Sequence, residues 1–389
     1  MTDHKLTSDE LVQLINRVFE PGPDERRLAI LVDLPDDRLP DDDDWRTRRE
    51  LAAGWAKTMQ DTTNDHGFSV DLYCYRNVAT NNADLPPTAF ATDPENLPRS
   101  AADLPVDRAI AFATVLAGHP LALAPTELSA TAPLKIMASR LGFRAATMPG
   151  FSPAMIPALR LDYGEVNRRV GWLKERLDRA VRCDIRFQVD GSEILELLLD
   201  LRHRTAHASG GLLPTPGTAG NLPSGEAYIV PYEGELQGDP TATAGRLPIQ
   251  FGNEVVLFRI DHNRAVEILS AGPASDAARA ALAAEPASGN VAELGLGVLS
   301  DFGVAPIGEV LLDEKLGLHI AFGRSEHFGG QVGPRQFSRP EAVVHQDHVY
   351  LRELQPRVVP ASVTLIFEDG DRCELMRDGR YAVDFAANR

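Results

Sequence analysis

The stretch LAILV, residues 28–32, is an uninterrupted apolar run that ends at Asp33. A short run of aliphatic side chains between polar residues predicts a strand buried on both faces, as in a parallel sheet. The stretch VDLYCY at 70–75 predicts a second strand, and helical patterns at 8–20 and 45–59 accompany the two strands. Alternating strands and helices are typical of a doubly wound α/β domain.

The alternation continues with a helix predicted at 106–117, and a longer helix is predicted from about 163 to 182. After this helix the pattern changes to short strands, Gly- and Pro-rich loops and two C-terminal hairpins with Asp-Gly turns. We therefore expect an α/β domain over residues 1–165 and a strand-rich α+β domain, the metal-binding one, over residues 166–389.

The composition restricts the classes of function. The chain has 389 residues and a formal net charge of −17, which argues against a nucleic-acid partner and against an anionic membrane surface. Its three cysteines lie far apart and predict neither a disulfide framework nor a cysteine-type zinc site. Neither a transmembrane pattern nor a signal-peptide pattern is visible, so we expect a cytoplasmic protein. A nucleotide-binding fingerprint is also missing after the first strand.

Four of the ten histidines lie in two nearby stretches, GLHIAFGRSEHFGG (317–330) and HQDH (345–348). If the second stretch is a strand, His345 and Asp347 point to the same face, because side chains alternate along a strand. His319 can supply a second imidazole. On spacing alone, a metal site and a chance crowding of surface histidines are about equally good interpretations.

Two carboxylates upstream lie in apolar surroundings. Glu226 opens an apolar stretch and Glu293 lies in NVAELGLG, and neither has a basic neighbour in the sequence. A carboxylate in such a setting needs a partner in the fold, and a metal ion is one candidate. The alternative, in which these residues are structural or solvated, stays open here. His203 and His207 are four residues apart, but their stretch is better interpreted as a strand running into a loop than as a helical ligand pair.

Several motifs together resemble the aminopeptidase T/aminopeptidase S family of metallopeptidases, which includes the thermophilic-type leucyl aminopeptidases. NLPSGEAYIVPYEGELQG, AELGLG, LLDEKLGLHIAFG with the following FGG, and HQD occur in the family's order and at about its separations. RAATMPGFSPAMI at 144–156 is similar as well, and the likeness covers about 125–389. It implies a homodimeric aminopeptidase that acts on short peptides with two divalent ions, Zn²⁺, Co²⁺ or Mn²⁺. The implied ligands are Glu226, Glu293, His319, His345 and Asp347.

The chain departs from the family pattern in two places. The family's tyrosine, seven residues after the first histidine, is replaced by Glu326, and a loop shorter by one residue would let His327 take its place. His327 would then be a further metal ligand, whereas an unligated Glu326 is a candidate general base. The family's tryptophan between histidine and aspartate is Gln346 in this chain.

Two other functions remain open on the sequence. Ring-cleaving dioxygenases of the dihydroxypyridine type resemble this family but hold a single Fe(II), which His345, Asp347 and one more histidine would suit. A histidine at position 293 would resemble those dioxygenases, so Glu293 favours the two-metal hydrolase. The other possibility is a non-catalytic relative, because the family's tyrosine is missing.

Overall fold

The computed structural model describes residues 5–386, and the chain has the mixed α/β fold expected from the sequence. It divides into two compact units, of which unit 1 is Met1–Asn167 with Gly211–Ser224 and unit 2 is Arg168–Gly210 with Gly225–Arg389. The segment 211–224, inside the expected 166–389 domain, belongs to unit 1 because its strand pairs with the sheet there. Within residues 5–386, no helix combines the length and the apolar character needed to cross a bilayer.

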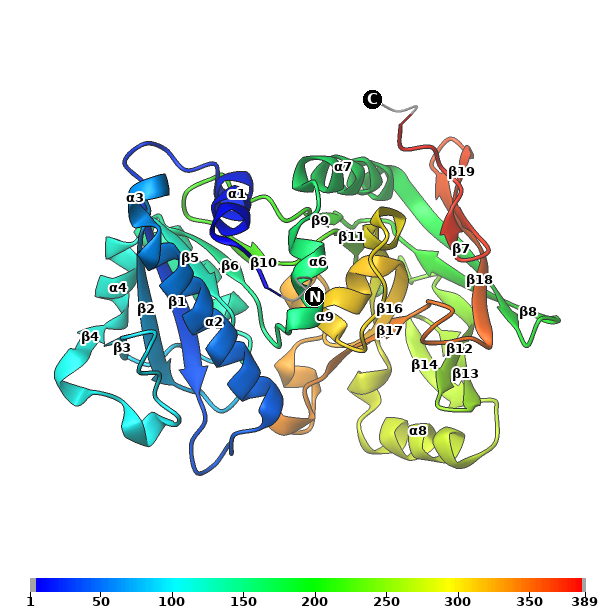
Figure 1. Cartoon of the computed structure of the whole chain (residues 1–389). Helices are drawn as coiled ribbons and strands as arrows, with labels where there is room; N and C mark the ends of the chain where they lie inside the picture. Colours follow the sequence, from blue (N-terminus) through cyan, green and yellow to red (C-terminus); the bar gives the residue numbers. More distant parts are fainter. Residues whose placement is uncertain (1–4, 387–389) are drawn as a thin grey trace. The chain divides into compact units, whose positions relative to one another are not determined.

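Unit 1 is built on one seven-stranded sheet with the order β10-β6-β5-β1-β2-β3-β4 (Figure 1). The strands from β10 to β2 run parallel, and β3 and β4 are antiparallel additions at one edge. The expected strand at 28–32 is the centre of β1, which is buried along all but its first residue. The strands are β1 (Arg27–Leu34), β2 (Ser69–Arg76), β3 (Thr88–Thr92), β4 (Ala109–Ala111), β5 (Leu121–Ala124), β6 (Arg144–Thr147) and β10 (Ala219–Asn221).

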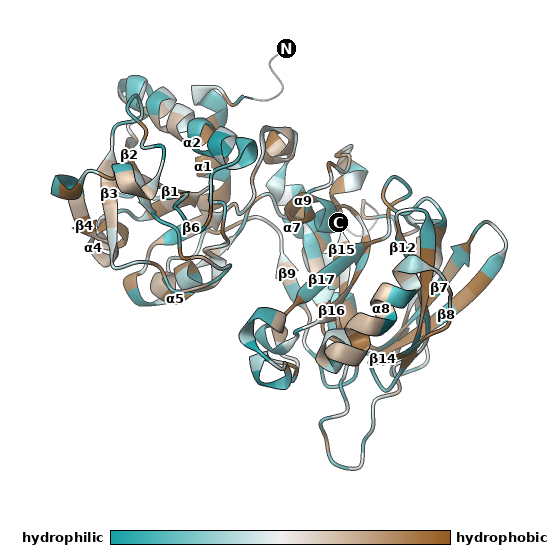
Figure 2. Ribbon diagram, turned by 90° about the horizontal axis from the view of Figure 1, so that it is seen from below, coloured by the Kyte–Doolittle hydropathy of each residue, from teal (hydrophilic) through white to brown (hydrophobic). Residues whose placement is uncertain are grey.

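Helices cover both faces of this sheet, with α1 and α2 on one side and α4 and α5 on the other (Figure 2). Alternate residues of β1 such as Leu31 pack in one cluster with Phe112 of α4 and Leu134 of α5. The helix expected at 106–117 forms only in its second part, because Ala109–Ala111 pairs with β3 as an edge strand. The helices are α1 (Ser8–Phe19), α2 (Asp43–Asp61), α3 (Thr63–His66), α4 (Phe112–Gly118), α5 (Thr131–Leu141), α6 (Ile156–Leu159) and α7 (Tyr163–Arg179), which continues into unit 2.

Unit 2 contains two sheets. The larger sheet has eight strands in the order β14-β13-β12-β8-β7-β18-β19-β20, and the smaller has five in the order β17-β16-β15-β11-β9. The strands of the larger sheet are β7 (Ala180–Val189), β8 (Glu193–Asp200), β12 (Ala244–Phe251), β13 (Glu254–Asp261), β14 (Arg264–Ile268), β18 (Val358–Phe367), β19 (Arg372–Arg377) and β20 (Arg380–Tyr381). The strands of the smaller sheet are β9 (His207–Ser209), β11 (Glu226–Ile229), β15 (Val291–Gly297), β16 (Leu318–Gly323) and β17 (His345–Val349).

The two expected C-terminal hairpins are present as β18–β19 and β19–β20. The helical elements of unit 2 include one that the sequence interpretation missed, α8 (Pro273–Ala284), and the short α9 (Val310–Asp313). Two 3-10 turns flank β16, η6 (Glu314–Leu316) before it and η7 (Glu326–Phe328) after it. The neighbouring strands of the five-stranded sheet and these two turns position the residues that follow.

Candidate metal centre

The five residues implied as metal ligands come from four neighbouring strands of the five-stranded sheet. Glu226 begins β11, Glu293 lies in β15, His319 in β16, and His345 and Asp347 in β17. All these strand pairs are antiparallel, and their register places the donors at nearby levels of one sheet face. The alternation expected for His345 and Asp347 holds, because Nε2 of the histidine lies 3.6 Å from Oδ1 of the aspartate.

Small residues on the same sheet face make room for these side chains. Gly295 is the register partner of His319, and a Cβ at position 295 would lie 1.9 Å from Nε2 of that imidazole. Ala321 is the partner of both Glu293 and Asp347 across its two neighbouring strands. The face therefore alternates between oxygen or nitrogen donors and side chains too small to fill the space between them.

The donors form two groups of three that share one carboxylate. Atoms of Glu226, Glu293 and His319 lie within 4.8 Å of one another, as do atoms of Glu293, His345 and Asp347. Oε1 of Glu293 is 3.2 Å from Nε2 of His319, and its Oε2 is 3.3 Å from Nε2 of His345. The two oxygens of Glu293 thus face different imidazoles, as a bridging carboxylate would.

The donor chemistry fits a divalent cation. Two ligands of a tetrahedral ion with bonds of about 2 Å are separated by about 3.3 Å, close to the distances found here. Within the described part of the chain, Oε2 of Glu226 and Oδ1 of Asp347 are buried and receive no hydrogen bond. Buried anionic oxygens without a donor are costly, and a cation would satisfy both.

The imidazoles and carboxylates also shift each other's pKa. Burial alone would lower the pKa of His319, but Glu293 and Glu226 outweigh it and raise the value to about 9. Burial would raise the pKa of Glu293, but His319 and His345 lower it to about 2. Nδ1 of His345 is 2.7 Å from the carbonyl oxygen of Arg324, to which it donates, so Nε2 is free to face the carboxylates.

Glu226 has a basic partner in the fold, although it has none nearby in the sequence. Nζ of Lys315, in η6, lies 2.5 Å from Oε1 of Glu226 and also contacts Glu314. The lysine side chain is only 2% exposed. Burial would lower the pKa of Lys315, but the charges of the two glutamates raise it above its usual range. The centre therefore already contains one fixed positive charge.

Glu326 and His327 follow β16 in η7, and both are exposed. The carboxylate of Glu326 pairs with Nε of Arg324 at 2.8 Å and belongs to neither donor group. The ring of His327 lies 5.3 Å from that of His345, almost perpendicular to it, and 3.9 Å from the ring of Phe328. Of the two residues, only His327 has its ring next to that of His345, a member of the candidate metal centre.

The loop after β16 has an anchor that the sequence interpretation missed. Glu233 accepts hydrogen bonds from Oγ of Ser325 at 2.6 Å, from Nδ2 of Asn290 at 2.8 Å and from the backbone N–H of Gln331. Arg204 pairs with this buried carboxylate. His207, set aside as a ligand from the sequence, contacts the carbonyl oxygen of Phe328 at 3.0 Å from its Nε2. Glu233 lies in the quoted VPYEGEL stretch, but its sequence position gives no sign of these partners.

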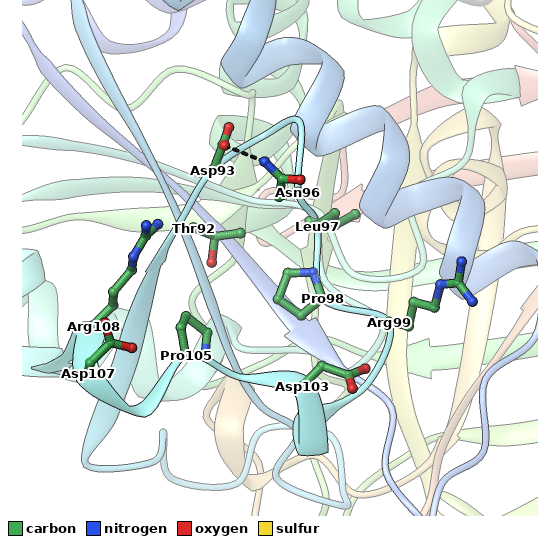
Figure 3. A pocket seen from close by; sticks show the side chains of 10 residues that line it. All are labelled: Thr92, Asp93, Asn96, Leu97, Pro98, Arg99, Asp103, Pro105, Asp107 and Arg108. Carbon is green, nitrogen blue, oxygen red and sulfur yellow. Dashed lines mark hydrogen bonds between the residues drawn. The ribbon is translucent and has the colours of Figure 1, made fainter.

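Unit 1 has a separate surface hollow beside the C-terminal end of β3 (Figure 3). Its charged lining residues include Asp93 and Asp103, which are occupied by local contacts to Asn96 and Ser100 respectively. Arg99, Asp107 and Arg108 complete the charged lining. The hollow contains no group of metal-binding side chains comparable to that of unit 2 among the described residues.

Comparisons with known proteins agree with the motif resemblance. No protein-family model matches the chain. Aminopeptidase T from Thermus thermophilus is 29% identical over 186 residues, which cover 45% of this chain and 42% of that protein. The resemblance to aminopeptidase T is thus confirmed, over less than half of either sequence.

Two solved structures share the fold along nearly the whole chain. The 2,5-dihydroxypyridine dioxygenase from Pseudomonas putida KT2440 has a TM-score of 0.60 at 14% identity and covers 98% of this chain and 99% of its own. Wild-type AmpT from Thermus thermophilus has a TM-score of 0.52 at 16% identity, and the match covers 97% of this chain and 99% of AmpT. These likenesses show a common fold for a peptidase and a dioxygenase, so the chemistry has to be argued from the site.

Proposed function

We propose that the chain is a metal-dependent aminopeptidase that releases N-terminal residues from short peptides. The observation that carries the proposal is the convergence of three carboxylates and two imidazoles on one sheet face, in two donor groups that share Glu293. The relationship to aminopeptidase T supports the peptidase class. A carboxylate at position 293, between the two groups, suits a two-ion hydrolase better than a single-iron dioxygenase.

The donor set suits Zn²⁺, Co²⁺ or Mn²⁺ held as a co-catalytic pair. One ion would be held by Glu226, Glu293 and His319, and the other by Glu293, His345 and Asp347. Ions bound there would lower the pKa of a bound water and polarise a peptide carbonyl group.

The chain's own residues would orient the ligands and the substrate. The carbonyl group of Arg324 fixes the ring of His345 with Nε2 toward the carboxylates. His327 lies beside that ring, so it is better placed than Glu326 to replace the family's tyrosine. Two roles remain predictions, that of Glu326 as general base and that of His327 as metal ligand. The free amino group of a peptide would be a further ligand for an ion held there, which would restrict cleavage to the N-terminal residue.

We also propose a homodimer, on the family resemblance alone, and a cytoplasmic location, as expected from the sequence. Light scattering at micromolar concentration tests the first part. A mass near twice the chain's 42.3 kDa is expected, and the mass of one chain would refute the dimer.

The peptidase proposal is tested with protein loaded with Zn²⁺, Co²⁺ or Mn²⁺ and a set of short peptides, each with a free or an acetylated amino terminus. Mass spectrometry should show loss of the N-terminal residue from the free peptides, no cleavage of the acetylated ones, and no reaction after chelation. Internal cleavage, or equal hydrolysis of both peptide forms, would contradict the proposal.

A further inference from the structure

Lys315 is a buried cation within the candidate metal centre, and its ammonium group is held from two sides. Its Nζ lies 2.5 Å from Oε1 of Glu226 and also contacts Oε1 of Glu314. The glutamate side chains are 8% and 16% exposed, so water can screen these charges only weakly. The contact joins residues 89 positions apart in the sequence, so it depends on the fold.

The ammonium group affects the two donor groups differently. In the first group, Glu226 has one oxygen on Lys315 and the other 3.6 Å from Nε2 of His319. A divalent ion held by this group would share the Glu226 carboxylate with the lysine, and the two cations would repel each other. The second group, Glu293 with His345 and Asp347, contains neither of the glutamates that pair with Lys315.

Charge neutralisation also favours an ion at the second donor group over one at the first. A carboxylate already compensated by an ammonium group is a weaker ligand for a second cation than one without a positive partner. Oδ1 of Asp347 and Oε2 of Glu226 are both buried and receive no hydrogen bond from the described residues, but the other oxygen of Glu226 is already bound to Lys315. The negative charge of the second donor group is therefore less compensated by the lysine, and an ion is more stabilising there.

We propose that Lys315 is a resident cation that makes the two metal positions unequal. The chain holds one divalent ion tightly at Glu293, His345 and Asp347, and binds a second only weakly at Glu226, Glu293 and His319. This inference rests on the proposed function for its metal ligands, but it concerns the number and affinity of the ions rather than the reaction.

The test is a metal count that needs no substrate. Purified protein is saturated with Zn²⁺, desalted and analysed for zinc per chain, and the second site is titrated by calorimetry. Wild-type protein should retain one ion and bind another at least about 100-fold more weakly. Lys315→Met removes the charge at similar length, and should retain two ions. Lys174→Met, which removes a lysine paired with Asp178 on helix α7, is the control and should behave as wild type.

Two equally tight ions in the wild-type protein, or an unchanged second site in a folded Lys315→Met variant, would overturn the inference. If Lys315→Met does not fold, Glu226→Gln provides the decision, because it removes a ligand of the weak position only. Glu226→Gln should keep the tight ion, and loss of that ion would also overturn the inference. If the ions are unequal as proposed but no peptide is cleaved, the proposed function fails while this inference stands.

Discussion

Gly295 of β15 lies directly opposite His319 of β16, and only the missing side chain of the glycine allows the imidazole to occupy its place. A Cβ at position 295 would lie 1.9 Å from Nε2 of His319. This nitrogen is the one that faces Glu226 and Glu293. The ring, at 0% exposure, is packed too closely to move aside cheaply.

Gly295→Ala should therefore displace His319 and weaken metal binding. Overpacking of this kind costs about 1–3 kcal/mol of folding free energy, and the displaced ring also loses its ligand position. Gly171→Ala is the matched control, because a Cβ there meets nothing within 4 Å and alanine favours a helix by up to about 1 kcal/mol. Zinc per chain and thermal unfolding check both variants, and full zinc retention by Gly295→Ala would refute the prediction.

Glu233→Ala should destabilise unit 2 and slow hydrolysis. It leaves the guanidinium group of Arg204 with less compensation and releases the loop that carries His327, because Ser325 and Gln331 lose their anchor. Breaking such a buried pair costs about 3–5 kcal/mol. Glu235→Ala is the control, since Glu235 also pairs with Arg204 but is 23% exposed. Urea unfolding should show a clearly larger loss of unfolding free energy for Glu233→Ala than for Glu235→Ala. Equal losses would argue against Glu233 as the anchor of the loop.

His327→Ala should impair hydrolysis more than Glu326→Ala. His327 packs against the ring of His345, whereas Glu326 is paired with Arg324 outside both donor groups. Losing a residue that supports a ligand reduces activity by about 10–100-fold, and Glu326→Ala should stay near the wild-type value. Measured kcat/KM values with one peptide decide the order, and the reverse order would make Glu326 the base or ligand.

Asp200→Asn should destabilise the protein at neutral pH and much less in acid. Burial would raise the pKa of Asp200, but Arg202 and backbone N–H groups outweigh it and lower the pKa below its ordinary value. The native state then binds fewer protons than the unfolded state, so this stabilisation is complete above about pH 4 and is lost as the pH falls through the folded value. Urea unfolding should show a smaller difference in unfolding free energy between wild type and Asp200→Asn at pH 3 than at pH 7. An equal difference at both pH values would contradict the prediction.

Much of the site could be predicted from the sequence because strand geometry is regular. His345 and Asp347 had to share a face once their segment was a strand, and the apolar run at 28–32 identified β1. The resemblance of the ordered motifs also identified Glu226, Glu293 and His319 as candidate ligands. Their convergence on one sheet face could be stated only after the strand order β17-β16-β15-β11 was known.

The contacts that modify the site could not be predicted in this way. Lys315 meets Glu226 across 89 residues, and a lysine beside a glutamate in LLDEKLG is ordinarily an exposed pair. The hydrogen-bond donors Asn290, Ser325 and Gln331 lie 57, 92 and 98 residues from Glu233. Helix α8 was detectable, because PASDAARAALAA begins with proline at its first position and is rich in alanine.

The most direct test compares two reactions of one metal-free preparation. Wild-type protein and His345→Ala are reconstituted separately with Zn²⁺ and with Fe(II), and each is assayed for release of N-terminal residues from short peptides and for oxygen uptake with a dihydroxypyridine. We expect peptide cleavage by the zinc-loaded wild type, loss of most of this cleavage in His345→Ala, and no oxygen uptake with either metal. Iron-dependent oxygen uptake without any peptide cleavage would contradict this expectation and establish the dioxygenase alternative despite Glu293.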